Sequence, residues 1–369
     1  MAKCLSSCSP EDVGFSVKRL SRVDKFIVDC IESGAFPGAV LLIAKDGYVV
    51  YHKAFGFSML IPDRQVMRLD TIFDLASITK SVVAAASTMI LVERGLLRID
   101  DPVCKFLPDF TGDGKDEVTI KHLLTHTSGL PAWKPFYTEA SSREEIFNLA
   151  LRTPLEQKPG EAVVYSDVGF IILTKIIEEL CEARIDEFAS KEIFMPLGMK
   201  DTMYNPPAEL KERIAATEYC KFREKVIWGE VHDENAWRMS GVSGHAGLFS
   251  TASDLAVFAQ MMLNLGAYGE VRILSPRSVK LMTMSHTSNL GEARGLGWDV
   301  KSGKASCGDL FSDKSFGHTG FTGTSLWVDP EAQMFVIFLT NRVHPTRENT
   351  AIIDVRPRLH NVIAASLVR

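Results

Sequence analysis

The chain has 369 residues, of which 46% are hydrophobic and 24% are charged, with 26 Gly and 16 Pro. These globular proportions exclude a disordered chain, a collagen-like repeat and a coiled-coil rod. The formal net charge of −5 argues against a nucleic-acid partner, and the length suffices for one large enzyme domain or for two or three smaller ones.

The cysteines and the apolar stretches indicate neither a cross-linked scaffold nor a membrane anchor. Seven cysteines are scattered without a CxxC pair, and Cys4 with Cys8 forms an isolated CxxxC, so a zinc knuckle and a disulfide scaffold are not expected. The first ten residues lack the apolar core of a signal peptide. The longest apolar stretch, Val82–Val92, is shorter than the roughly 20 residues of a membrane span and indicates a buried helix. We expect no membrane span and a cytoplasmic location for the sequence as given, with an exported form whose signal has been removed as the alternative.

The hydrophobic pattern predicts strands at both ends of the chain and helices between them. An amphipathic helix is expected over Ser16–Ser33, followed by two strands, 38–44 and 48–54, around an Asp-Gly turn. Residues 76–225 are predicted to be mainly helical, with helices at Ser77–Arg94, Ile120–Leu124, Arg143–Leu151, Asp167–Cys181 and Ile185–Ile193. After about residue 290 the pattern predicts strands at Gly295–Val300, Ser325–Asp329 and Met334–Leu339, and a final helix at Ile352–Leu367. This order indicates an α/β layer closed by both termini and carrying an all-α insertion, with a cleft at the junction.

The segment Phe73–Ser81 places a serine and a lysine, Ser77 and Lys80, three residues apart at the start of an apolar helix. Residues at this spacing share a helix face, so the Lys80 amine can reach the Ser77 hydroxyl, a nucleophile that needs a base within hydrogen-bond reach. The same pattern also fits a serine N-cap followed by a solvated lysine. The apolar run after Lys80 favours the functional interpretation, because a buried lysine needs a partner.

Two further segments accompany this pair: Tyr165-Ser166-Asp167 precedes a predicted helix, and His318-Thr319-Gly320 precedes the strand predicted at Ser325–Asp329. In this order the chain resembles the penicillin-recognising serine hydrolases, whose pattern is S-x-x-K, then Y-x-N, then K-T-G or H-T-G. These include class C β-lactamases, D,D-carboxypeptidases, D-aminopeptidases and β-lactamase-like esterases. The stretches 120–131, 196–199 and 247–255 also resemble this family, so the resemblance covers about residues 10–365.

The resemblance implies a β-lactamase/transpeptidase-like fold, α/β plus all-α, with a mainly antiparallel sheet flanked by helices and a helical insertion lobe. It implies a single catalytic domain over residues 10–369, because Ser77 and His318 must meet within it. The α/β lobe would comprise about 10–75 and 226–369, and the helical lobe about 76–225.

The resemblance assigns Ser77 as the nucleophile, Lys80 as the amine that activates it and Tyr165 as the residue that passes protons to the leaving group. The backbone N–H groups of Ser77 and Phe321 would form the oxyanion hole. The titrations of Lys80 and Tyr165 are coupled, so the identity of the base stays open between them.

Two positions depart from the usual family pattern. Asp167 stands where asparagine is common, and a carboxylate near Lys80 would favour the protonated amine and shift the base role to Tyr165. His318 replaces lysine, and with an ordinary pKa near 6.5 it would anchor a substrate carboxylate less strongly. Thr319 and Gly320 complete this predicted substrate-positioning motif.

A second pattern lies in residues 229–247, where His232 and Asp233 are followed by His245 in a Gly-His-Ala-Gly loop. It resembles the branch that contains muropeptide amidases and suggests a substrate derived from the cell wall. His245 is either a substrate contact or a loop histidine bonded to nearby backbone. These residues are suitable zinc ligands, but their spacing matches no zinc motif, so neither a metal nor another cofactor is predicted. His122 and His126, four residues apart, are assigned a structural role.

The sequence thus predicts a serine hydrolase that forms a covalent acyl-enzyme on an amide or ester. The expected partner is a small-molecule or peptide-like substrate, first of all a peptidoglycan-derived fragment. The alternatives are a general carboxylesterase or acyltransferase, a β-lactamase and, outside catalysis, a slowly acylating penicillin-binding sensor. No nucleic-acid partner is expected, and the sequence leaves the oligomeric state open.

Overall fold

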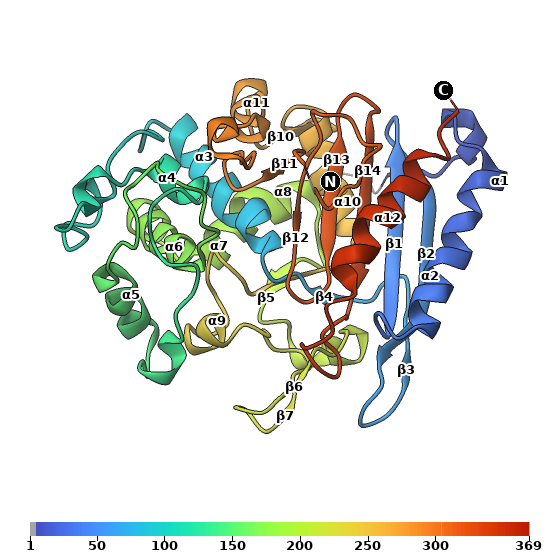
Figure 1. Ribbon diagram of the computed structural model, residues 1–369, viewed down its shortest axis with the longest axis horizontal. Coiled ribbons are helices and arrows are strands. Elements are labelled where there is room, and N and C mark those ends of the chain that lie inside the picture. The colour runs from blue at the N-terminus through green and yellow to red at the C-terminus, as the bar shows by residue number, and fades with distance from the viewer. Residues whose placement is uncertain (1–4, 304, 369) are drawn as a thin grey trace.

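A seven-stranded antiparallel sheet, in the order β11-β12-β13-β14-β1-β2-β3, forms the centre of the fold (Figure 1). The computed structural model describes residues 5–303 and 305–368; residues 1–4, 304 and 369 lie outside this description, and with them Cys4 of the CxxxC pair. The strands of this sheet are β1 (Gly38–Lys45), β2 (Tyr48–Met59), β3 (Gln65–Val66), β11 (Asp299–Val300), β12 (Phe316–Thr319), β13 (Ser325–Asp329) and β14 (Met334–Thr340).

The two central strands, β1 and β14, are buried on both faces and are therefore apolar almost throughout. Alternate side chains of β1 enter different cores: Leu41 and Ile43 pack with residues of α2 (Arg22–Glu32) and α12 (Ile352–Ala364), which lie together on one face of the sheet (Figure 1). Val40 and Leu42 pack into the larger core on the other face, which contains α10 (Ala252–Leu263).

The remaining α-helices, apart from α1, lie between β3 and β11 in the chain. Figure 1 shows α4, α5 and α6 at the opposite end of the molecule from α1 and α2. The α-helices are α1 (Val17–Leu20), α3 (Ala86–Glu93), α4 (Ile120–Leu124), α5 (Arg143–Arg152), α6 (Asp167–Cys181), α7 (Ile185–Ala189), α8 (Met195–Leu197), α9 (Glu234–Arg238) and α11 (Pro276–Thr283). Two π-helical segments cover Lys80–Ala85 and Ser190–Phe194, and single 3₁₀ turns cover Pro10–Val13, Val103–Lys105, Lys115–Glu117, Phe136–Thr138, Ala208–Arg213 and Ser288–Leu290.

Small sheets complete the fold. They comprise β4 (Phe73–Asp74), β8 (Leu248–Ser250) and β5 (Met203–Tyr204), the hairpin of β6 (Tyr219–Cys220) and β7 (Lys225–Val226), and the hairpin of β9 (Ala267–Tyr268) and β10 (Val271–Arg272). The antiparallel sheet flanked by helices confirms the predicted fold class, whereas the division into two lobes stays a prediction. Within the described residues, no helix is both long enough and apolar enough to cross a bilayer. The described cysteines are all free thiols.

Two helices that begin at a polar cap, Ile120–Leu124 and Asp167–Cys181, were predicted with the correct bounds. Thr119 accepts a hydrogen bond from the His122 backbone at the start of α4, and Ser166 accepts one from Gly169 at the start of α6. The strand at Ser325–Asp329 is also confirmed. The helix predicted over Ser16–Ser33 is interrupted at Ser21, and the final helix ends at Ala364 rather than Leu367.

The helix predicted at Ser77–Arg94 is helical, but Lys80–Ala85 is wound as a π-helix before α3 begins. The residues from Lys80 to Ala85 are all buried, so an apolar period cannot distinguish the two windings. The second half of the helix predicted at Ile185–Ile193 is likewise π-helical.

The strand predicted at Gly295–Val300 is wrong for its first four residues. Gly297 has a φ of 73°, donates its N–H to the Leu124 carbonyl at 2.8 Å and accepts the Ser81 hydroxyl at 2.6 Å. These bonds draw the chain onto the buried helix, and only Asp299–Val300 joins the sheet. His318 and Thr319 precede the strand at Ser325–Asp329 as predicted, and they also end a further strand, β12, that was not predicted.

We expect Gly297→Ala to destabilise the protein more than Gly95→Ala. The two glycines have φ values of 73° and 71°, so the left-handed backbone alone costs an alanine roughly 1–2 kcal/mol at either position. At Gly297 the new Cβ would lie 2.5 Å from the Cβ of Ala85, whereas no atom lies within 4 Å at Gly95. Overpacking of this kind costs about 1–3 kcal/mol more. Urea unfolding of both variants measures the difference, and equal losses would contradict the close approach at Gly297.

Candidate active site

The amine of Lys80 lies at the centre of the predicted site and is fully buried. Its Nζ donates to Ser77 Oγ at 2.9 Å and to the carbonyl oxygen of His245 at 3.1 Å. It also forms an ion pair with Asp167 Oδ1 at 2.7 Å. A buried ammonium is costly unless it is paired and hydrogen-bonded, and these partners meet that requirement.

Tyr165 and Asp167 are positioned by the N-cap of α6, because Ser166 lies between them and caps the helix. The Ser166 N–H donates to Nδ1 of His126 at 2.9 Å, and the His126 ring packs against Tyr165 with centroids 4.3 Å apart. This packing agrees with the structural role predicted for His126. The Tyr165 hydroxyl hydrogen-bonds with both Lys80 and Ser77. The structure therefore brings together the four residues of the first two motifs.

The protonation of this group is set by burial and by Asp167. Burial disfavours the charged amine, but Asp167 and Tyr165 outweigh it and raise the pKa of Lys80 above its ordinary value. Burial raises the pKa of Tyr165 as well, although the Lys80 cation opposes it. The resting site thus holds an ammonium and a neutral phenol, and a proton must leave one of them before either can accept the proton of Ser77.

The expected oxyanion donors are free of intramolecular partners. Within the described residues, neither the Ser77 N–H nor the Phe321 N–H donates a hydrogen bond. Phe321 follows Gly320 just beyond β12, and a Cβ on Gly320 would lie 2.3 Å from the Leu75 carbonyl oxygen. Only glycine allows the turn that carries Phe321 to approach the segment before Ser77 so closely.

His318 is a neutral group in this structure. Burial lowers the pKa of His318 to about 4, so the imidazole carries no charge at pH 7. Its Nδ1 contacts the Thr319 carbonyl oxygen at 2.8 Å, which assigns the proton to Nδ1 and leaves Nε2 as an acceptor without a partner. A cationic anchor for a substrate carboxylate is therefore absent at this position.

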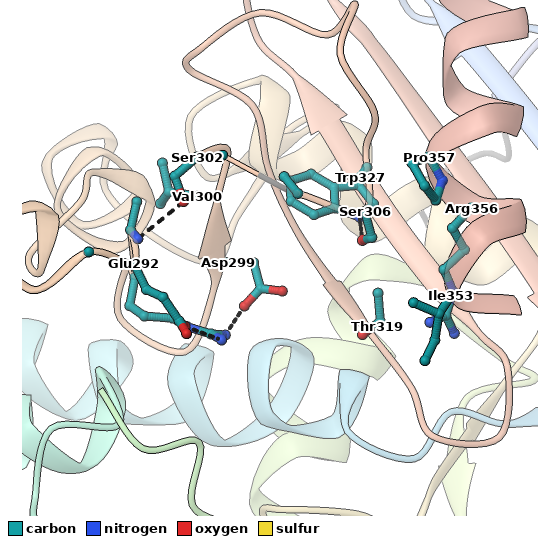
Figure 2. A pocket seen from close by; sticks show the side chains of 15 residues that line it. Glu292, Asp299, Val300, Ser302, Ser306, Thr319, Trp327, Ile353, Arg356 and Pro357 are labelled. Carbon is teal, nitrogen blue, oxygen red and sulfur yellow. Dashed lines mark hydrogen bonds and ion pairs between the residues drawn. The ribbon is translucent and has the colours of Figure 1, made fainter. Parts of the chain in front are cut away.

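A cavity of about 630 Å³ contains the candidate site. Seven of the residues predicted to form the site line this cavity: Ser77, Tyr165, Asp167, His245, Thr319, Gly320 and Phe321. His318 is not among the described residues that line it, and its ring lies 6.0 Å from that of Tyr165. A second cavity, of about 440 Å³, shares Thr319, Ile353 and Arg356 with the first. In Figure 2 the side chain of Arg356 runs from α12 toward Ile353 and Thr319.

The ring of His245 is held on both sides by protein groups. Its Nε2 lies 2.9 Å from Asp233 Oδ1, and its Nδ1 lies 2.7 Å from Ser243 Oγ. Burial opposes a charge on Asp233, but His245 and a backbone N–H outweigh it and lower the pKa of that carboxyl group. His245 therefore reaches the catalytic group through its carbonyl oxygen, which accepts from Lys80, and its role in substrate contact stays a prediction.

Three arginines that line the larger cavity, Arg342, Arg347 and Arg356, were not predicted from the sequence. Arg356 lies among the buried residues of α12, and a charged residue on the apolar face of that predicted helix was the available signal. Its Nη2 donates to the carbonyl oxygens of Gly320 and Thr324, and its Nε is buried without a partner. Burial lowers the pKa of Arg356 to about 9, which leaves it charged at pH 7.

A group of acidic and thiol ligands, Glu218, Cys220 and Glu234, lies beside this cavity with its ligand atoms within 4.8 Å of one another. Arg347 already donates to both carboxylates, at 2.5 Å in the case of Glu234. Burial opposes the charge on Glu218, but Arg347 and His232 lower the pKa of its carboxyl group to about 2. The guanidinium thus supplies the positive charge that a metal ion would otherwise bring.

A serine hydroxyl bonded to a buried amine and a phenol, beside two free backbone N–H groups, defines a serine hydrolase of the acyl-transfer type. The profile of the beta-lactamase family matches residues 23–357. The chain is 36% identical to a protein of Escherichia coli (strain K12) named "Putative D-alanyl-D-alanine carboxypeptidase", over 92% of this chain and 86% of the relative.

Two solved structures share the fold. The octameric penicillin-binding protein homologue from Pyrococcus abyssi is 27% identical, with a TM-score of 0.71 over 91% of this chain and 76% of that chain. A penicillin-binding protein homologue from Caulobacter crescentus is 21% identical, with a TM-score of 0.76 over 96% and 99% of the two chains. The chain belongs to the beta-lactamase family and is a serine hydrolase. The predicted family resemblance is confirmed.

We expect Asp167→Asn to move the basic limb of the pH profile of kcat/KM to lower pH. With Tyr165 as the base, the Lys80 cation that lowers the phenol pKa must stay charged, so loss of its proton ends activity at high pH. Asp167 raises the pKa of Lys80, so its removal lets the ammonium lose that proton at lower pH. An opposite charge at this range changes a pKa by roughly 1 to 3, and we expect a movement of at least about one pH unit. Asp186→Asn, which removes a carboxylate outside the cavity, is the matched control. An unchanged basic limb in Asp167→Asn would refute control of Lys80 by Asp167.

Proposed function

We propose that the protein hydrolyses a peptide-like amide or an ester through a covalent intermediate on Ser77. The observation that carries this proposal is the 2.9 Å hydrogen bond from the buried Lys80 amine to Ser77 Oγ, inside a cavity of about 630 Å³. A serine becomes an effective nucleophile when a base lies at this distance. The unpaired N–H groups of Ser77 and Phe321 supply the donors that the tetrahedral oxyanion needs.

The reaction proceeds in two halves. In the first, the Tyr165–Lys80 pair has already lost one proton to solvent. Ser77 Oγ attacks the carbonyl carbon and gives its proton to this pair, and the carbonyl oxygen becomes an oxyanion. The pair then protonates the leaving amine or alcohol as its bond to carbon breaks, and the acyl group stays on Ser77. In the second, water gives a proton to the same pair and attacks the acyl carbon, and Ser77 Oγ leaves with a proton restored.

The proposed substrate class is a peptide fragment of peptidoglycan with a free carboxylate near the cleaved bond. The name of the Escherichia coli relative supports this class. The cationic wall of the cavity supports it as well, because Arg342 and Arg356 donate to backbone carbonyl oxygens and form no ion pair within the described residues. These arginines offer a positive charge to a substrate carboxylate that neutral His318 does not.

A general esterase or acyltransferase is the second candidate. The neutral state of His318 favours it, because an ester or amide without a free carboxylate needs no cation on β12. A β-lactamase comes third, because penicillins carry a free carboxylate and the neutral His318 offers it no positive charge.

Loss of the nucleophile tests the enzyme proposal. We expect Ser77→Ala to lower turnover of a p-nitrophenyl ester by a factor of about 10³ or more, because the covalent route is removed. Mass spectrometry of the wild-type protein, incubated with muropeptides, esters or penicillins, should show an acyl adduct on Ser77. Unchanged turnover in Ser77→Ala would refute the mechanism. Labelling of Ser77 without product release would favour the alternative of a slowly acylating sensor.

The arginine proposal predicts a change of specificity. We expect Arg356→Gln to lower kcat/KM for an acetylated peptide ending in D-Ala-D-Ala more than for the same peptide with an amidated carboxyl end. The ratio of the two values should fall by roughly 10- to 100-fold, since a charge-assisted hydrogen bond contributes about 1.5–3 kcal/mol. Glutamine keeps an N–H donor for Gly320 and Thr324. Arg358→Gln, an exposed change on the same helix, is the control. An unchanged ratio in Arg356→Gln would exclude Arg356 as the carboxylate partner.

A further inference from the structure

Asp74 is a buried carboxylate that the proposed mechanism does not use. It ends strand β4, three residues before Ser77, and is 2% exposed. Its Oδ1 accepts the Ala76 N–H at 2.8 Å, and its Oδ2 accepts the His232 N–H at 2.7 Å. Within the described residues no lysine or arginine forms an ion pair with it. Burial raises the pKa of Asp74. A carboxylate buried without a cation is costly, so its two backbone bonds call for an explanation.

The first bond holds the residue before the nucleophile in an unusual conformation. Ala76 has a φ of 46°, in the left-handed region that residues with a Cβ rarely adopt. The Asp74 carboxylate reaches two residues ahead to the Ala76 N–H, which closes a turn around Leu75. The peptide that follows Ala76 carries the Ser77 N–H, so the direction of this donor depends on the turn that Asp74 closes.

The second bond fixes the other side of the oxyanion hole. Oδ2 of Asp74 holds the backbone of His232, and the His232 ring stacks on the Phe321 ring with centroids 5.6 Å apart. The main chain of the same segment also holds the Phe321 turn. Thr322 Oγ1 donates to the Asp74 carbonyl oxygen at 2.7 Å, and Thr324 Oγ1 donates to that of Leu75 at 3.0 Å. Figure 1 shows β4 close to the end of β12 that leads into this turn.

We infer that Asp74 is the positioning residue of the oxyanion hole. Its two carboxylate oxygens fix the backbone on either side, so that the Ser77 and Phe321 N–H groups converge on one point. Asp74 touches neither the substrate nor the reacting atoms, and the inference rests on the proposed acyl-transfer function of Ser77. An oxyanion hole stabilises a charge that exists only in the tetrahedral state, so its misalignment lowers kcat rather than substrate binding.

The test uses Asp74→Asn in the full chain. Asparagine matches the shape of aspartate, but its NH₂ group must face one of the two N–H donors, so one of the two hydrogen bonds is lost. We expect kcat for the p-nitrophenyl ester to fall by roughly 10- to 100-fold, with KM changed less than about threefold. Asp74→Ala, which removes both bonds, should lose more.

A second readout separates positioning from a general loss of structure. Phenylboronic acid accepts the Ser77 oxygen at boron and becomes tetrahedral, with a boron-bound oxygen in the place of the oxyanion. Its Ki should rise in Asp74→Asn by the same factor by which kcat falls, because both report the same donors. The matched control is Asp254→Asn, since Asp254 is a partly buried carboxylate outside the cavity that accepts hydrogen bonds from the Asp201 N–H at 2.7 Å and from the Thr202 hydroxyl at 2.9 Å. We expect it to lower thermal stability without a comparable loss of kcat.

Each outcome decides the inference. It is overturned if Asp74→Asn keeps kcat within threefold, if kcat falls while the Ki of phenylboronic acid stays constant, or if Asp254→Asn loses as much kcat as Asp74→Asn. If Asp74→Ala does not fold, the kcat and Ki values of Asp74→Asn decide the inference by themselves. Ser77→Ala identifies a failure of the proposed function separately, because ester turnover that survives that change would not depend on this oxyanion hole at all.

Discussion

The burial of one ammonium group organises the region around the candidate site. Removing a charge from water costs several kcal/mol, so the Lys80 amine requires its partners to be present together. These partners come from the start of α6, from the turn at Ser77 and from the carbonyl oxygen of His245, three segments far apart in the chain. The glycine-rich loop reaches Lys80 because Gly244 has no side chain: a Cβ there would lie 2.7 Å from the Thr174 hydroxyl and 3.0 Å from the Cβ of Ala84. The proposed nucleophile, the proposed proton-transfer group and the loop are therefore assembled as one unit.

The distribution of charge around the cavity differs from what the family pattern implies. A lysine on β12 would bring a permanent cation to the strand beside the substrate, whereas His318 is neutral there. Two of the three cavity arginines, Arg342 just after β14 and Arg356 on α12, are held instead by backbone carbonyl oxygens. Positive charge is thus available to an anionic substrate group without a cation at position 318 of β12. This separation keeps the amine paired with Asp167, its only carboxylate partner within the described residues.

What the sequence could predict depended on whether a signal was local. The spacing of Ser77 and Lys80 lies within one helical turn, and the caps Thr119 and Ser166 lie directly before their helices, so the corresponding predictions were correct. The structure of residues 295–298 depends on bonds to Leu124 and Ser81, more than 100 residues away, and the local β-like pattern there was misleading. Asp74 acts through His232 and Thr322, and no spacing in the sequence indicates those contacts. Asp167 could therefore be interpreted from its motif beforehand, whereas Asp74 could not.

The pairing of β1 with β14 has a consequence for how the protein is made. Ala39 lies opposite Thr340, about 300 residues later, so the central strand pair cannot form until nearly the whole chain has left the ribosome. Until then β1 and β2 can pair as a hairpin, but the other edge of β1 stays open along a strand that is apolar on both faces. An open strand edge of this kind can pair with a second nascent chain. Rapid synthesis brings more such chains together at one time and should therefore favour aggregation over folding. The same delay withholds catalysis, since the strand that leads to Phe321 and the helix that carries Arg356 are among the last parts to emerge.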